Sequence, residues 1–125
     1  MTPLSEIPTA TLKELEQEFV DEDNLDELCD AHNDLIKVII EKEEELITSH
    51  REHIDQVVDL IKSDMTLLQI VDQPNSDIEQ YVKDLDRMLC NKVEMIGKIR
   101  LQLVQFYQTL KKEEQLQQLY AKRVN

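Results

Sequence analysis

Two histidines, His50 and His53, come nearest in this sequence to a chemically useful pair. Three residues apart on a helix, they would share one face and could hold a metal ion together. No HExxH motif and no third ligand accompanies them, although a zinc site needs at least three protein ligands. We therefore interpret both as solvated or packing side chains and predict no metal site.

The other residue types that carry catalysis are equally isolated. Cys29 and Cys90 form no CxxC motif, so the sequence indicates neither a zinc site nor a disulfide framework. Two free thiols are typical of a reducing, intracellular compartment. Gly97 is the one glycine and cannot build a phosphate-binding loop, and no GxxxxGK[ST] motif occurs. We predict that this chain is not an enzyme: no catalytic residue and no cofactor.

Composition and charge narrow the class of protein. The 125 residues are 41% hydrophobic and 33% charged, with one glycine and three prolines, which is typical of long helices. The net charge is −13, whereas nucleic-acid binding needs a basic face. No apolar run approaches the ~20 residues of a membrane span, and the first residues do not form a signal peptide. We expect a soluble protein whose partners are neither nucleic acid nor membrane.

Capping patterns and prolines divide the chain into elements. Thr11 with Glu14, and Asn24 with Glu27, are helix-start patterns. We predict helices over about residues 11–20, 25–70 and 77–117, with a turn at 71–76, in a single helical domain over 11–120. Residues 1–10, which hold two prolines, are expected to be flexible, and residues 121–125 to be frayed.

The turn carries the most specific local signal. Pro74 cannot continue a helix and disfavours a helical conformation in the residue before it. Ser76 and Glu79 form an S-x-x-E capping box, so Ser76 is expected to cap the next helix and Glu79 to return the bond. The two long helices are therefore predicted to fold back on each other as an antiparallel hairpin.

Apolar residues repeat every seven positions in both long helices. A lone helix cannot bury such a stripe, and two helices cover each other poorly, whereas two hairpins would form a four-helix bundle. We therefore predict an all-α fold, a long antiparallel hairpin with a short N-terminal helix. It pairs into a dimeric four-helix bundle or coiled coil; a purely intrachain hairpin is the alternative. Lys92 interrupts the stripe and either sets its register or extends to solvent. The residues expected at helix–helix interfaces are Ile47, Ile54, Ile61, Leu68, Ile78, Val82, Leu85, Leu89, Ile96, Ile99, Leu103, Phe106 and Leu110.

Three segments resemble the C-terminal tail of kinesin-13 motors. They read EEELITSHREHID (43–55), MTLLQIVDQPNSDIEQYVKDLDRML (65–89) and LVQFYQTLKKEEQ (103–115), with the HR and DQP sequences as the most specific marks. The resemblance spans about seventy residues, and residues 1–40 match no tail feature. Members of this family are microtubule-depolymerising ATPases with an internal motor. This chain has no P-loop, so the resemblance carries no catalytic residue onto it.

The resemblance implies a dimerising, regulatory tail that contacts tubulin, microtubules or the motor domain of its own parent protein. It also implies a place in the cytoplasm on the cytoskeleton, at microtubules, spindle or centrosome. Ser5, Ile7 and Pro8 fit the S-x-I-P pattern that end-binding proteins read, although a plain linker is the favoured interpretation. The alternative function is a helical adaptor that binds a cytoskeletal or centrosomal protein through acidic faces at 21–30 and 41–45, without self-association.

Overall fold

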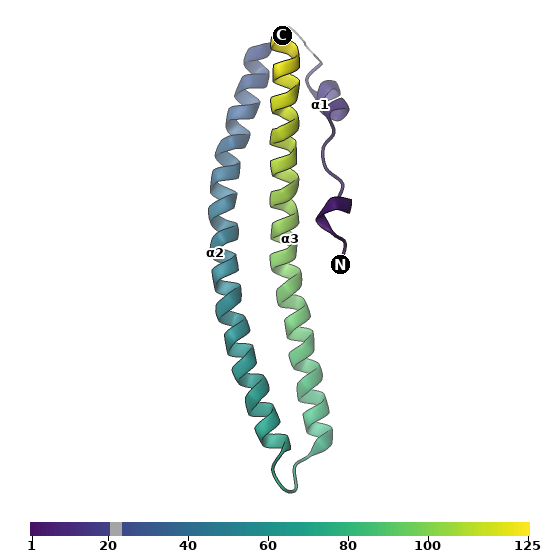
Figure 1. The fold of residues 1–125 in the computed structure, drawn as a ribbon, viewed down its shortest axis with the longest axis vertical. Coiled ribbons are helices and arrows are strands. Elements are labelled where there is room, and N and C mark those ends of the chain that lie inside the picture. The colour runs from purple at the N-terminus through teal and green to yellow at the C-terminus, as the bar shows by residue number, and fades with distance from the viewer. Residues whose placement is uncertain (21–23) are drawn as a thin grey trace. The chain divides into compact units, whose positions relative to one another are not determined.

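The structure, a computed structural model, describes residues 1–20 and 24–125, and every element in them is helical. A 3-10 helix, η1, spans Leu4–Glu6, and three α-helices follow: α1 (Leu12–Glu18), α2 (Leu25–Val71) and α3 (Ile78–Val124). α2 and α3 are joined by one short turn (Figure 1). The prediction of an all-α helical hairpin with a short N-terminal helix is confirmed.

The chain divides into two compact units. The core unit consists of Met1–Leu46 with Gln102–Asn125, and the hairpin unit is Ile47–Leu101. The core unit therefore contains α1 and one stretch each of α2 and α3. The hairpin unit contains the turn and the adjoining stretches of the same two long helices. The single domain expected over residues 11–120 stays a prediction.

The helices of the core unit begin where the capping patterns place them. The Glu14 backbone N–H donates to Thr11 Oγ1 over 3.2 Å at the start of α1. At the start of α2, the Glu27 N–H donates to Asn24 Oδ1 over 3.0 Å, and Asn24 Nδ2 donates to Glu27 Oε2 over 3.0 Å. These bonds satisfy backbone donors that a helix leaves unpaired in its first turn. Both predicted starts are confirmed.

Four leucines close the core unit: Leu15, Leu28, Leu116 and Leu119, each at most 2% exposed. One comes from α1, one from α2 and two from α3, so all three helices contribute to this core. Across the two long helices, His32 Nε2 lies 2.9 Å from Glu113 Oε1. The core therefore depends on α1 packing beside the long-helix pair (Figure 1).

The C-terminal end of α3 differs from the sequence-based expectation. The helix continues to Val124 instead of ending near 117 and fraying after 120. Lys122 Nζ donates to Glu16 Oε1 over 2.7 Å, and the Arg123 guanidinium donates to the Phe19 carbonyl oxygen. These bonds to α1 and its C-cap, together with the buried Leu119, hold the last turns in place.

The N-terminal segment contains a short helix and is bonded to α3, while its flexibility stays a prediction. Residues 1–10, predicted to be flexible, contain η1, and Gln108 Nε2 donates to the Pro8 carbonyl oxygen over 3.0 Å. A glutamine side chain of α3 therefore holds this segment, which sequence periodicity could not have revealed.

The turn of the hairpin unit corrects the predicted cap. Pro74 lies in the turn, and Asn75 adopts φ 64°, a left-handed conformation that asparagine tolerates. The N-cap is Asp77, not Ser76: its Oδ1 accepts from the Glu79 and Gln80 N–H groups over 3.1 and 3.2 Å.

Ser76 has a different partner. Its hydroxyl donates to the Val71 carbonyl oxygen over 2.9 Å and so satisfies an acceptor at the end of α2. Glu79 returns no bond to Ser76 but lies 3.5 Å from Lys83 Nζ. The reversal at Asn75 carries Ser76 back to the preceding helix, which leaves the cap to Asp77. A carboxylate is favoured there by the partial positive charge of a helix N-terminus.

Candidate helix–helix interface

The hairpin unit is held together by a seam of half-buried side chains. They recur at alternating spacings of four and three residues on both helices, which is the spacing of a coiled-coil core. The seam residues are His53, Val57, Leu60, Asp64, Leu67 and Val71 on α2, and Tyr81, Leu85, Met88, Lys92, Met95 and Ile99 on α3. Residues 47–101 are all described, and none of them is fully buried. The seam therefore closes only partly.

One ion pair crosses the seam. Lys92 Nζ lies 2.6 Å from Asp64 Oδ2, and both side chains are partly buried. The polar residue that interrupts the apolar stripe thus has an acidic partner at a seam position of the other helix. A slip of the two helices along each other would separate these charges, so the pair favours this one register.

A second row of apolar side chains on each helix is left exposed. Apart from Ile47, which continues the row at the same spacing, each follows a seam residue by one place along the chain, with Ile54 after His53 and Val93 after Lys92 as examples. We call this set the apolar side. Its members are Ile47, Ile54, Val58, Ile61, Met65 and Leu68 on α2, and Val82, Leu89, Val93 and Ile96 on α3. Their exposures range from 42% to 71%.

The two exposed rows lie on the same side of the hairpin. One residue turns an α-helix by about 100°, so each row is rotated from its seam by that angle in the same sense. Two antiparallel helices are related by a two-fold axis perpendicular to the plane that contains them. That axis exchanges the two helices but does not exchange the two faces of the pair. Residues that follow the seam by one place on either helix therefore lie on the same face.

A cavity on the hairpin unit shows the same relation for residues that precede the seam by one place. About 260 Å³ in volume, it is lined from both helices. Ser63, Thr66 and Ile70 of α2 each precede a seam residue by one place. Asp84, Arg87 and Asn91 of α3 do the same, and all six line this one cavity. Residues of equal offset therefore do share a side. We call this the polar side.

The structure places the predicted interface residues in four settings. Leu85 and Ile99 lie in the seam, and Phe106 is half-buried in the core unit. Seven more form most of the apolar side: Ile47, Ile54, Ile61, Leu68, Val82, Leu89 and Ile96. Ile78, Leu103 and Leu110 are also exposed. Whether a second chain covers the exposed residues stays a prediction.

Sequence reasoning gave less weight to much of the intrachain seam. Leu60, Met88 and Met95 were not among the predicted interface residues, yet all are half-buried at seam positions. A heptad count begun one residue earlier on α2 would have found this seam, because it brings Leu60, Leu67 and Val71 into the repeat. The seven-residue repeat of Ile47, Ile54, Ile61 and Leu68 indicated the exposed side instead.

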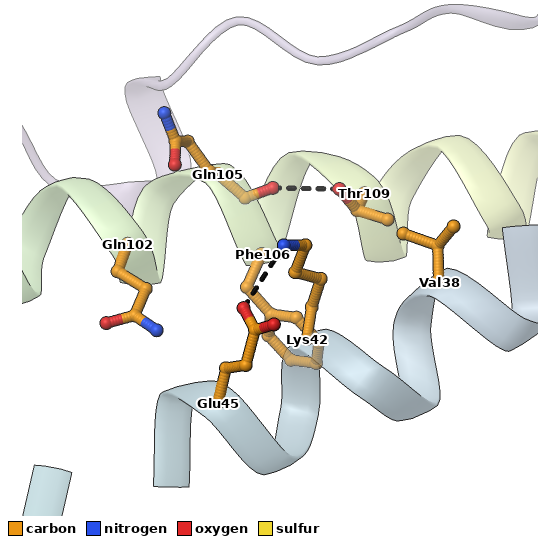
Figure 2. Close-up of a pocket in the computed structure, with 7 residues that line it drawn as sticks. All are labelled: Val38, Lys42, Glu45, Gln102, Gln105, Phe106 and Thr109. Carbon is orange, nitrogen blue, oxygen red and sulfur yellow. Dashed lines mark hydrogen bonds and ion pairs between the residues drawn. The ribbon is translucent and has the colours of Figure 1, made fainter. Parts of the chain in front are cut away.

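The core unit has a hollow of about 150 Å³ between α2 and α3, with seven lining residues: Val38, Lys42, Glu45, Gln102, Gln105, Phe106 and Thr109 (Figure 2). Two interactions among the lining residues are each made within one helix. Lys42 Nζ lies 3.1 Å from Glu45 Oε2, and Thr109 Oγ1 donates to the Gln105 carbonyl oxygen over 3.0 Å. The Lys42–Glu45 ion pair joins two exposed side chains three residues apart on one helix, and the Thr109 hydroxyl is bonded to a backbone carbonyl and not to a base.

The histidine pair and the S-x-I-P motif are the other candidate sites from the sequence. His50 is exposed and His53 lies in the seam; the described part of the chain contains no cluster of three or more His, Cys, Asp or Glu placed to hold a metal ion. Ser5 is exposed and Ile7 is half-buried, while the Pro8 carbonyl is bonded to Gln108. Within residues 1–20 and 24–125, no helix is both long and apolar enough to cross a membrane.

The sequence of this chain is similar to two plant kinesin-like proteins. The chain is 37% identical over 79 residues to "Kinesin-like protein KIN-13A" from Oryza sativa subsp. japonica, which covers 63% of this chain and 10% of that protein. It is 26% identical over 84 residues to "Kinesin-like protein KIN-13B" from Arabidopsis thaliana, over 67% of this chain and 12% of that protein. This chain is related to the kinesin-13 family. The resemblance noted in its sequence is thereby confirmed.

The kinesin-13 relationship covers a limited length of those proteins. The chain spans about a tenth of the length of the curated relatives it matches. No protein-family model matches it, and no solved structure matches it. The kinesin-13 similarity therefore supports a relationship to that family and does not by itself define the role of this part of the protein.

Proposed function

We propose that this chain is a non-catalytic dimerisation and regulatory module, the C-terminal tail of a microtubule-depolymerising kinesin, and that it acts through helix–helix contacts. The observation that carries the proposal is the apolar side of the hairpin unit. Ten apolar side chains gather there, each at least 42% exposed. The relationship to kinesin-13 proteins supports the parent protein's identity.

The packing of the hairpin unit supports self-association. Single exposed apolar side chains are normal on a protein surface, but a contiguous group of ten is typical of an interaction site. The unit, Ile47–Leu101, has 55 residues and contains no fully buried side chain. Domains of this size seldom supply more than a few kcal/mol from one core, and a partner helix pair is one common remedy.

The regulatory part of the proposal is supported by charge and by family. Residues 1–30 carry a net charge of −9 and residues 77–125 carry +2. An uneven distribution of this kind steers a module toward charged partners. We propose tubulin or the motor domain of the parent protein as those partners, and the microtubule cytoskeleton as the place of action.

Light scattering on the 125-residue chain tests the dimerisation part. The expected mass is close to twice 14.7 kDa across a range of micromolar concentrations. A folded species of 14.7 kDa at every concentration would remove dimerisation from the proposal. Co-sedimentation with microtubules tests the tubulin part separately, because a dimer that stays in the supernatant at low salt would contradict it.

A further inference from the structure

We infer that two copies of this chain pair through the apolar sides of their hairpin units, forming a four-helix bundle with both polar sides facing solvent. This inference rests on the proposed dimerisation function and adds the surface through which it occurs. It is argued from three observations on the hairpin unit: the number of apolar rows, the contrast between its two sides, and the area of exposed apolar surface.

Each helix of the hairpin unit carries two apolar rows rather than one. On α2, positions 47, 51, 54, 58, 61, 65 and 68 alternate in steps of four and three, and only Arg51 among them is not apolar. On α3, positions 82, 86, 89, 93 and 96 do the same, with Asp86 as the exception. A helix in a two-stranded coiled coil contacts one neighbour and needs one row. A helix in a four-helix bundle contacts two neighbours and needs two.

The two sides of the hairpin unit differ sharply in chemistry. The residues that directly precede seam positions are nearly all polar: Glu52, Gln56, Asp59, Ser63, Thr66, Gln80, Asp84, Arg87, Asn91, Glu94 and Lys98. Ile70 is the apolar residue among them, and it is exposed. Only the apolar side therefore offers a continuous surface for another pair of helices.

The exposed area matches what a second copy would cover. A large apolar side chain presents roughly 60–120 Å² to water when fully exposed, so ten half-exposed ones present on the order of 500 Å² of apolar surface. A stable interface covers roughly 800 Å² per partner, a little more than half of it apolar. The chain itself supplies a matching surface of the same length, and pairing one patch with its own copy is the commonest arrangement in protein dimers.

A pair of charge-matched double variants tests the inference. Met65→Glu with Val93→Glu places two carboxylates on the apolar side, at positions 57% and 71% exposed within one chain. Thr66→Glu with Asn91→Glu places them on the polar side. Glutamate is a good helix former, so neither variant should lose helix through propensity.

The expected result is a shift in dimer affinity for one variant only. In sedimentation equilibrium, Met65→Glu/Val93→Glu should dissociate on the order of 100-fold more readily than wild type, because each buried carboxylate would be unpaired. Thr66→Glu/Asn91→Glu should remain a dimer with wild-type affinity. Helical circular dichroism checks that both variants fold. Should the first unfold, Met65→Gln/Val93→Gln replaces it, with a smaller weakening expected in the same direction.

The outcomes separate the inference from the function on which it rests. If wild type is a dimer and both double variants remain dimers, or both dissociate, the apolar side is not the interface and the inference fails, while dimerisation stands. If wild type is a folded monomer, dimerisation itself fails, and the apolar side is covered by a different protein or by nothing.

Discussion

The core unit and the hairpin unit are built from the same two helices, yet only one of them closes a core. In the core unit, α1 packs beside the long-helix pair and four leucines become at most 2% exposed. In the hairpin unit, two helices lie together without a third, and none of residues 47–101 is fully buried. The difference teaches that two long helices of this sequence need at least one more helix to exclude water.

The first prediction tests the comparison with one substitution in each unit. Leu28→Ala should lower the free energy of unfolding by about 2–5 kcal/mol, because it opens a cavity beside three helices at a residue with 0% exposure. The loss should not depend on protein concentration. Urea unfolding followed by circular dichroism measures it.

Leu68→Ala is the matched control, because it makes the same change on the same helix and so has the same effect on helix propensity. Leu68 is 51% exposed, so its loss should be small in dilute protein and grow as the concentration favours dimer. Equal losses for the two variants in dilute protein would break the comparison between the units.

The second prediction concerns the turn that the hairpin unit alone contains. Asp77→Ala should cost about 1 kcal/mol, because the Glu79 and Gln80 N–H groups lose their acceptor at the start of α3. Asp77→Asn, which keeps a capping oxygen, should cost clearly less. Thermal unfolding of each variant gives the ranking.

Ser76→Ala is the variant that would contradict this assignment. It removes one bond to the Val71 carbonyl and should cost about 0.5–1 kcal/mol. If Ser76→Ala proves more costly than Asp77→Ala, the capping box predicted from sequence is correct and Asp77 is not the cap.

The fold could be predicted from local signals because those signals act over a few residues. Thr11 with Glu14, and Asn24 with Glu27, start helices through bonds that the sequence spacing itself dictates. Pro74 cannot continue a helix, because its ring clashes with the preceding turn and it lacks a backbone N–H. The prediction of Ser76 as cap was wrong for a non-local reason. Two adjacent residues could both cap, and the reversal at Asn75 decided between them.

The seam between α2 and α3 was harder to predict, because periodicity alone does not show which row of side chains packs against the other helix. Both helices carry two rows of equal spacing, one residue apart, and a sequence cannot say which row its own hairpin uses. The seam includes residues as polar as His53, Asp64 and Lys92, while the apolar side, which is more uniformly apolar, stays exposed. The ion pair between Lys92 and Asp64 explains this choice in part, because only one register brings the two charges together.

The third prediction sharpens the comparison at the one glycine. A Cβ added at Gly97 would meet nothing within 4 Å in a single chain. Gly97→Ala should therefore stabilise the hairpin unit by about 0.5–1 kcal/mol, because glycine loses more conformational freedom than alanine in a helix. Thermal unfolding in dilute protein measures the gain. A loss that appears only at concentrations where the dimer forms would place a partner helix against Gly97.

The fourth prediction, with the smallest expected effect, concerns the attachment of α1 that the hairpin unit lacks. A hydrogen bond from Lys122 and the charge of that ammonium hold the pKa of Glu16 below its usual value of 4.5. A carboxyl whose pKa is lowered by folding stabilises the fold above its usual pKa, and this contribution is lost as the pH falls through the lowered value. The effect should be small because the pair is exposed to solvent and screened by salt.

Glu16→Gln should therefore melt at a lower temperature than wild type at pH 7 and at the same temperature once the pH is well below the lowered pKa. Glu18→Gln makes the same change of charge in the same helix and is the matched control. Melting both variants beside wild type from pH 7 down to pH 2.5, at low salt, measures the difference. A Glu16→Gln deficit that persists unchanged in acid would mean that the carboxylate charge does not hold α1 against α3. The third helix of the core unit would then be retained by its leucines alone.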